Sequence, residues 1–285
     1  DIAGESPCGP GNTRGDVGCC LNMLGTGLGL EALDSIADAG LDYLELSLRD
    51  LVALGKQAAP TIANLESIGL PCRSCNNLFP GSIRLLGSMF DESAFRLYLE
   101  RAFDTAAISG ARVVVFGSGE ARHAGGRPEA DWLPELADRL RAIAGVAAQY
   151  GIIVAIEPLN RGECDTVNNL NQAKSLAVLA GCANVGLLVD SYHMLLEGDS
   201  PGDAANYGPS VVHAHLSAGR ERRMPKGNDS FPSAVLSALF SVGYHGRVSI
   251  EALSRDPFGE LADAVKFIRA VRERVEQNID RYKNP

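Results

Sequence analysis

The sequence predicts a single (β/α)₈ TIM barrel, an α/β fold in which eight parallel strands alternate with helices. Two observations carry this prediction. Eight short, β-branched and apolar runs alternate with helical patterns, and each of the last four runs closes on a polar residue. The chain has 285 residues, of which 46% are hydrophobic, and such a barrel usually takes about 250 residues. Length and apolar content therefore suit one barrel.

The expected strands recur at intervals of about one strand-loop-helix-loop unit. They cover residues 17–23, 42–47, 71–76, 112–117, 152–157, 185–190, 211–215 and 247–251. Helical patterns cover residues 30–40, 60–69, 92–110, 131–151, 169–180, 231–242 and 258–280, and several end in Gly, a frequent helix terminator. Strict alternation favours a parallel sheet covered by helices, and eight units favour closure into a barrel.

An open, doubly wound sheet is the competing fold. It usually carries a G-x-G-x-x-G fingerprint after the first strand, but here Gly25, Gly27 and Gly29 place the third glycine one residue too early. Residues 1–15 are rich in Gly, Pro and small polar side chains, so we expect a flexible leader. Residues 16–285 then form one catalytic domain.

Charge and hydropathy exclude some classes of protein. Lys and Arg total 26 against 35 for Asp and Glu, a net charge of −9, which disfavours a protein that binds nucleic-acid phosphates. No apolar stretch reaches the roughly 18 residues that span a bilayer, and the layout of a signal peptide is absent. We expect a cytoplasmic protein without membrane partners.

The cysteines do not indicate a metal or redox motif. They number seven, and Cys72 and Cys75 form one isolated C-x-x-C within an expected strand. Because side chains alternate along a strand, a spacing of three predicts that these two thiols point to opposite faces. We interpret the cysteines as structural or incidental, and reduced thiols suit a cytosolic compartment.

Four polar residues close consecutive expected strands and form the strongest functional signal. They are Glu157, Asp190, His215 and Glu251. In TIM barrels the carboxyl ends of the strands meet at the catalytic mouth, so these side chains should converge. Three carboxylates packed together repel one another, and a divalent cation is the simplest compensation. This oxygen-rich set suits Mn²⁺, with Mg²⁺ or Co²⁺ as alternatives, better than structural Zn²⁺.

The predicted site also indicates a reaction. A sugar with a carbonyl beside a hydroxyl could chelate such a cation, which would stabilise the enediolate formed when the α-proton is removed. Strands five and eight face each other obliquely across a barrel. Glu157 and Glu251 could therefore act from opposite sides, one abstracting and the other returning a proton. Inversion at one carbon would result.

Several stretches resemble a known superfamily. Residues 156–163 (IEPLNRGE), 189–194 (VDSYHM), 213–227 (HAHLSAGRERRMPKG) and 243–253 (GYHGRVSIEAL) are similar to xylose-isomerase-like sugar isomerases and epimerases. The similarity is closest to ketose 3-epimerases of the D-tagatose and D-psicose type. The resemblance implies a sugar substrate and a dimer or tetramer. It also implies that the metal ligands are Glu157, Asp190, His215 and Glu251. Of these, Glu157 and Glu251 would form the acid/base pair.

The resemblance also implies three substrate contacts, Glu163, His193 and an arginine after the metal-binding histidine. We select Arg222, with Arg220 and Arg223 as rivals. Two alternative interpretations remain. His193 could instead be a hydrogen-bond partner of a metal ligand. The basic cluster could instead bind a phosphate through Arg220, Arg222, Arg223 and Lys226. His213 lies two residues before His215, so we expect it on the same side of the strand.

Other functions remain open. An aldose-ketose isomerase or an inosose-type dehydratase would begin with the same proton removal and differ in pocket walls such as Asn22, Glu45 and Phe116. A nuclease of the endonuclease IV type shares the barrel, but that resemblance implies further histidines at the ends of strands three and four. The sequence offers Asn76, Asn77 and Gly117 there. A catalytically silent sugar-binding barrel would not need both carboxylates.

Overall fold

The computed structural model describes residues 15–24, 36–67 and 69–283, and their strands form one closed parallel barrel. The strand order follows the sequence from β1 to β8, and β1 closes the barrel against β8. The strands are β1 (Val17–Cys20), β2 (Tyr43–Ser47), β3 (Cys72–Asn76), β4 (Val113–Phe116), β5 (Ile153–Ile156), β6 (Val185–Asp190), β7 (Val211–Leu216) and β8 (Val248–Ile250). The predicted fold is confirmed.

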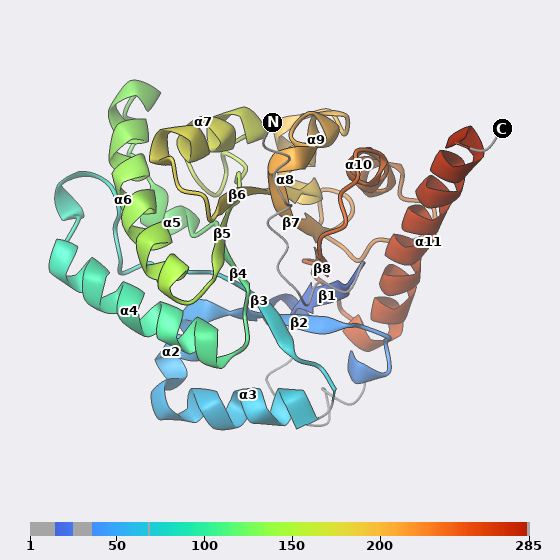
Figure 1. Ribbon diagram of the computed structural model, residues 1–285, viewed down its shortest axis with the longest axis horizontal. Coiled ribbons are helices and arrows are strands. Elements are labelled where there is room, and N and C mark those ends of the chain that lie inside the picture. The colour runs from blue at the N-terminus through green and yellow to red at the C-terminus, as the bar shows by residue number, and fades with distance from the viewer. Residues whose placement is uncertain (1–14, 25–35, 68, 284–285) are drawn as a thin grey trace.

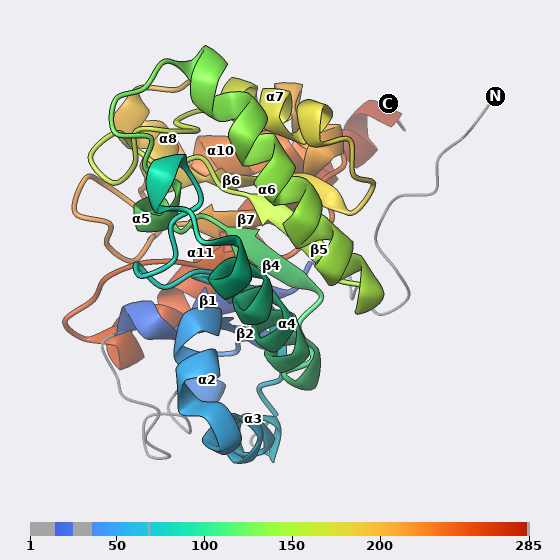
Figure 2. The ribbon, with the colours of Figure 1, turned by 90° about the vertical axis from the view of Figure 1, so that its left-hand side faces the viewer.

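Helices surround the barrel (Figure 1). They are α2 (Leu48–Leu54), α3 (Ala58–Ser67), α4 (Glu92–Ile108), α5 (Gly119–Arg122), α6 (Glu129–Gln149), α7 (Leu170–Ala180), α8 (Ser191–Glu197), α9 (Asp203–Asn206), α10 (Ser230–Ser241) and α11 (Pro257–Lys283). Figure 2 shows α4, α6 and α7 along one side of the barrel, and α10 packs on α11. Within the described ranges, no helix is long and apolar enough to cross a membrane.

Most predicted elements match within a few residues, with two differences at the amino-terminal end. The first strand ends at Cys20, and a 3₁₀ helix over Leu21–Leu24 replaces its expected second half. Most of the helix expected over 30–40, and nearly all of the expected leader, lie outside the described residues. Short helices such as α8 were not predicted, because a seven-residue segment shows too little of a 3.6-residue period.

The prediction for the two thiols of the C-x-x-C was wrong. Leu44 pairs with Cys72 and the next residue, Glu45, pairs with Ser74, so Arg73 forms a bulge that interrupts the side-chain alternation. The sulfurs of Cys72 and Cys75 consequently lie 3.8 Å apart. The same bulge places Ser74 in register with Glu45, and the two side chains are hydrogen-bonded.

Two apolar layers hold the barrel together. The large core fills the space between strands and helices, and a small separate cluster of Val113, Val115, Ala155 and Leu188 is also buried. Val113 pairs with Ser74 and Leu188 with His213, which places the small cluster inside the barrel. Four polar side chains are also fully buried in the interior, Glu45, Ser74, His213 and Ser249. Barrel interiors are usually filled with branched apolar side chains, so these polar side chains need an explanation.

Candidate active site

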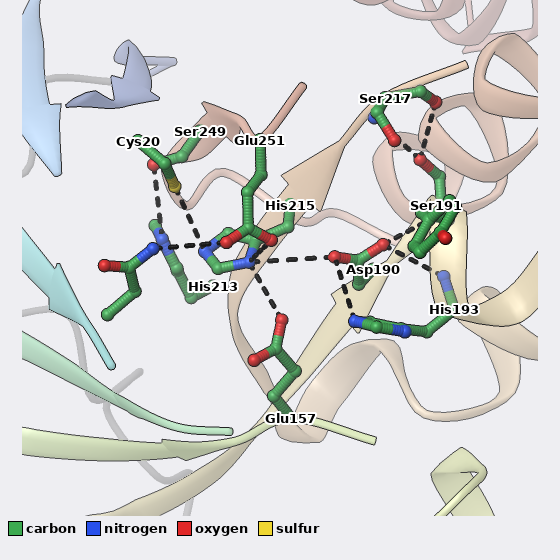
Figure 3. A network of polar contacts seen from close by, with 12 residues as sticks. Cys20, Glu157, Asp190, Ser191, His193, His213, His215, Ser217, Ser249 and Glu251 are labelled. Atoms are coloured by element: carbon green, nitrogen blue, oxygen red, sulfur yellow. Dashed lines mark hydrogen bonds and ion pairs between the residues drawn. The ribbon is translucent and has the colours of Figure 1, made fainter. Parts of the chain in front are cut away.

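The structure brings the four strand-end residues together. Glu157 and Glu251 directly follow β5 and β8, Asp190 ends β6, and His215 lies in β7. One donor atom from each of the four lies within 4.8 Å of the others, and all four residues are buried. The Nδ1 atom of His215 lies 2.9 Å from Oε2 of Glu251, 3.0 Å from Oε1 of Glu157 and 3.8 Å from Oδ2 of Asp190. Figure 3 shows His215 among these carboxylates.

The two oxygens of Asp190 have separate environments. Oδ1 caps the short helix α8 by accepting hydrogen bonds from the backbone N–H groups of Tyr192 and His193, at 2.6 and 3.2 Å. Oδ2 is buried and has no hydrogen-bond partner, although a buried carboxylate oxygen normally needs one. The oxygen that faces His215 is therefore not hydrogen-bonded, although it lies 3.5 Å from Nη2 of Arg222.

The pKa shifts in this cluster indicate that its carboxylates are stabilised by nearby positive charge. Burial raises the pKa of Asp190 to about 8, although Arg222 opposes this. Burial also acts to raise the pKa of Glu251, but His215 and Arg222 hold that pKa well below its usual range. Burial opposes protonation of His215, yet Glu251 and Glu45 raise its pKa well above the ordinary value. His215 and Arg222 thus act on the carboxylates in the way that a nearby positive charge does.

These residues fit a divalent cation. The donor set contains three carboxylates and one imidazole nitrogen, a combination that can hold a divalent cation. Oδ2 of Asp190, which has no hydrogen bond, can serve as one of the ligand atoms. A cation would also take over the charge compensation that otherwise falls to His215.

Glu157 is supported by Gly117 and Arg122. A Cβ atom at Gly117 would lie 2.1 Å from Oε2 of Glu157, so only glycine leaves room for this carboxylate. Arg122 is fully buried and donates to the carbonyl oxygens of Phe116 and Glu157, each at 3.0 Å. Its guanidinium also lies 5.2 Å from the centre of the Phe116 ring. Arg122 therefore fixes the backbone from which Glu157 projects.

Arg222 is the arginine that reaches the cluster. Its Nη2 atom lies 2.5 Å from Oε2 of Glu251 and 3.5 Å from Oδ2 of Asp190, and its guanidinium lies 4.6 Å from the centre of the Tyr192 ring. Its φ of 52° is a left-handed conformation that is uncommon for a residue with a side chain. The rivals point elsewhere. Arg220 is exposed, and Arg223 pairs with Asp229.

Asn160 links the other two expected substrate contacts. Its backbone N–H donates to Nδ1 of His193 at 3.1 Å, and its side-chain Nδ2 lies 2.9 Å from the same atom. The Nδ2 group also donates to Oε1 of Glu163 at 2.9 Å. His193 is almost completely buried, and its Nε2 atom lies 3.9 Å from Oδ2 of Asp190. Glu163 lies 3.9 Å from Arg222 and is more exposed.

Sequence reasoning missed four supporting residues. Asn76 donates to Oε1 of Glu251 at 3.1 Å, and its place at the end of a strand was the signal that could have revealed it. Asn160 lies on a loop and Arg122 ends the four-residue helix α5, so neither gave a periodic signal. Glu45 was expected as a pocket wall, but it lies inside the barrel, where Oε1 is 3.0 Å from Nε2 of His215. His213 lies on the same side as His215, as predicted, and also contacts Glu45.

Comparison with known proteins identifies the family. Residues 33–271 match the family described as xylose isomerase-like TIM barrel. The chain belongs to this family. A 3-dehydro-D-guloside 4-epimerase from Escherichia coli strain K12 is 29% identical over 137 residues, which cover 47% of this chain and 52% of the relative. A 3-dehydroshikimate dehydratase from Pseudomonas aeruginosa is 28% identical over 277 residues, or 88% of this chain and 41% of the relative.

A solved structure of another protein has the same fold as this chain. The crystal structure of D-psicose 3-epimerase in the presence of D-fructose has a TM-score of 0.77 and 20% sequence identity, covering 90% of this chain and 99% of that one. The matches to the curated relatives span about half the length of those proteins or less. The comparisons therefore show the family and the fold.

Proposed function

We propose that this protein is a divalent-metal-dependent sugar epimerase that inverts C3 of a ketose through an enediolate. The observation that carries the proposal is the convergence of Glu157 and Glu251, whose carboxylates lie 3.0 and 2.9 Å from Nδ1 of His215, with Asp190 completing the set. When bound there, a divalent cation, Mn²⁺ in this proposal, would polarise the substrate carbonyl and stabilise negative charge on its oxygen.

The two glutamates supply the proton transfers. Glu251 is ionised, because His215 and Arg222 keep its pKa low, and it accepts hydrogen bonds from Asn76 and Arg222 that fix its orientation. Glu157 reaches the same nitrogen of His215 from the end of β5, next to Gly117 and with its backbone held by Arg122. One carboxylate would remove the C3 proton from one face, and the other acid would return a proton to the opposite face.

The remaining residues would position the sugar. Since Nδ1 of His193 accepts from the backbone of Asn160, its ring proton is on Nε2, which can donate to a substrate oxygen. Glu163 can accept from a hydroxyl, and Arg222 can donate to an oxygen beside Glu251. We assign substrate binding to Glu163, His193 and Arg222.

The relatives support the class of chemistry. The 4-epimerase acts beside the carbonyl of a 3-dehydro sugar, and the D-psicose 3-epimerase acts at the carbon beside a ketose carbonyl. The dehydratase also takes a 3-dehydro substrate, so loss of water after the same proton removal is the second candidate. A nuclease is disfavoured, because Asn76 and Gly117 stand at the ends of β3 and β4.

The test is a product analysis of the Mn²⁺-loaded protein with fructose, psicose, tagatose and ribulose. Chromatography should detect the C3 epimer of at least one sugar. Glu157→Gln and Glu251→Gln should each abolish it, whereas Glu100→Gln, on the exposed face of α4, should leave the rate unchanged. Formation of an aldose or loss of water from every substrate, or no product with any, would contradict the proposal.

A further inference from the structure

The buried polar side chains of the barrel interior are organised around Glu45. This residue lies in the middle of β2, is fully buried, and is in register with Cys20 on one side and Ser74 on the other. Its carboxylate contacts His215, one of the proposed cation ligands. Burying a carboxylate is costly unless hydrogen-bond donors surround it.

Both oxygens of Glu45 have donors, and the two oxygens serve different groups. Oε2 accepts from Ser249 at 2.5 Å and from Ser74 at 2.9 Å, and lies 2.7 Å from Nε2 of His213. Tyr43 extends the network, because its hydroxyl lies 2.7 Å from that of Ser249. Oε1 faces Nε2 of His215 at 3.0 Å. One oxygen of Glu45 therefore contacts the surrounding buried side chains, and the other contacts His215.

The bond to Oε1 decides which nitrogen of His215 carries a proton. An ionised carboxylate can only accept, so Nε2 of His215 must be the N–H donor. Nδ1 is then the one ring nitrogen that could present a lone pair to a bound cation, and it lies 3.0 and 2.9 Å from oxygens of Glu157 and Glu251. A histidine that binds a metal commonly donates its other N–H to a carboxylate, which fixes its orientation and increases its basicity.

We propose that Glu45 is a positioning residue of the cation site, which holds His215 with a proton on Nε2 and so leaves Nδ1, the nitrogen that faces the carboxylates, to bind the cation. This inference rests on the proposed metal dependence. It explains why a charged residue occupies a barrel layer that apolar side chains usually fill. A purely structural role would account for the cost of removing Glu45, but not for a dependence of cation affinity on its charge.

The first test measures Mn²⁺ affinity by titration calorimetry on wild-type protein, Glu45→Gln and Tyr43→Phe. Glu45→Gln keeps the shape but removes the charge, and we expect its affinity to fall by roughly 10- to 100-fold. Tyr43→Phe removes a buried hydrogen bond from the same network without touching His215, and its affinity should equal that of the wild type. Equal losses in both variants, or none in Glu45→Gln, would overturn the inference. A wild-type protein that binds no Mn²⁺ would overturn the proposed metal site together with it.

A second measurement does not depend on the variant being folded. In wild-type protein labelled with ¹⁵N-histidine and loaded with a diamagnetic divalent cation, two-bond ¹H–¹⁵N correlations report which ring nitrogen of His215 is protonated. The inference predicts a proton on Nε2, protected from solvent exchange, and none on Nδ1. A proton on Nδ1 of His215 would overturn it.

Discussion

The backbone N–H of Asn160 donates a hydrogen bond to Nδ1 of His193, at a distance of 3.1 Å. Because a backbone amide cannot accept, this bond keeps Nδ1 unprotonated and places the proton on Nε2. Burial and the nearby Arg222 lower the pKa of His193 to about 4. A neutral imidazole with its N–H directed toward Asp190 is thus built into the folded protein at neutral pH.

This arrangement predicts a stability that depends on pH. Between about pH 6.5 and about pH 4 the unfolded chain binds a proton at His193 that the folded protein does not, so the free energy of unfolding decreases as the pH falls. The full effect is about 3 kcal/mol. Urea unfolding of wild type and His193→Gln at about pH 7 and about pH 4 measures it. The stability difference between the two proteins should shift in favour of the variant at low pH, whereas a constant difference would contradict the assignment.

The choice of Arg222 over its neighbours predicts a specific pattern of activity. Arg222→Lys keeps the charge but cannot reproduce the planar fork that contacts Glu251 while lying over Tyr192. We expect a loss of about 2 kcal/mol, or about 30-fold, in kcat/KM. The exposed Arg220 provides the matched control, and Arg220→Lys should retain wild-type activity. Comparable losses in both variants would place the functional arginine elsewhere in the loop.

Gly117 offers a test of the geometry around Glu157. An alanine Cβ there would lie 2.1 Å from Oε2 of Glu157, and the carboxylate can swing away at little cost to folding. Gly117→Ala should therefore change the free energy of unfolding by less than about 1 kcal/mol, yet lower kcat by up to about 100-fold through displacement of the carboxylate.

The control is Gly145→Ala, in the exposed part of α6, where an added Cβ meets nothing within 4 Å. It should leave activity unchanged and raise stability by roughly 0.5–1 kcal/mol. Full activity in Gly117→Ala would show that the position of the Glu157 carboxylate is not critical.

The strand ends were predictable because the carboxyl ends of parallel strands meet at one place. Glu157, Asp190, His215 and Glu251 each close a recognisable β-branched run, so position in the sequence translates directly into position at the mouth. The residues beneath the mouth were not predictable in the same way. Which side of β3 faces inward depends on the bulge at Arg73, and a bulge arises from pairing with β2 that no local pattern reveals.

The support of the site depends on contacts between distant segments. Glu45 and His215 are separated by 170 residues, and Asn76 and Glu251 by 175. Composition and periodicity carry no information on such pairs until the barrel is closed. The left-handed backbone of Arg222, which directs it inward while Arg223 turns to Asp229, is likewise a property of the folded loop.

The central claim is that Glu157 and Glu251 exchange the proton on C3 of a ketose. The most direct measurement is NMR of the sugar after incubation in D₂O with the cation-loaded protein. Proton abstraction and return predict deuterium at C3 of the starting ketose and of its epimer, and no incorporation with Glu157→Gln or Glu251→Gln. Epimer formation without deuterium at C3, or deuterium at C1 with formation of an aldose, would contradict it.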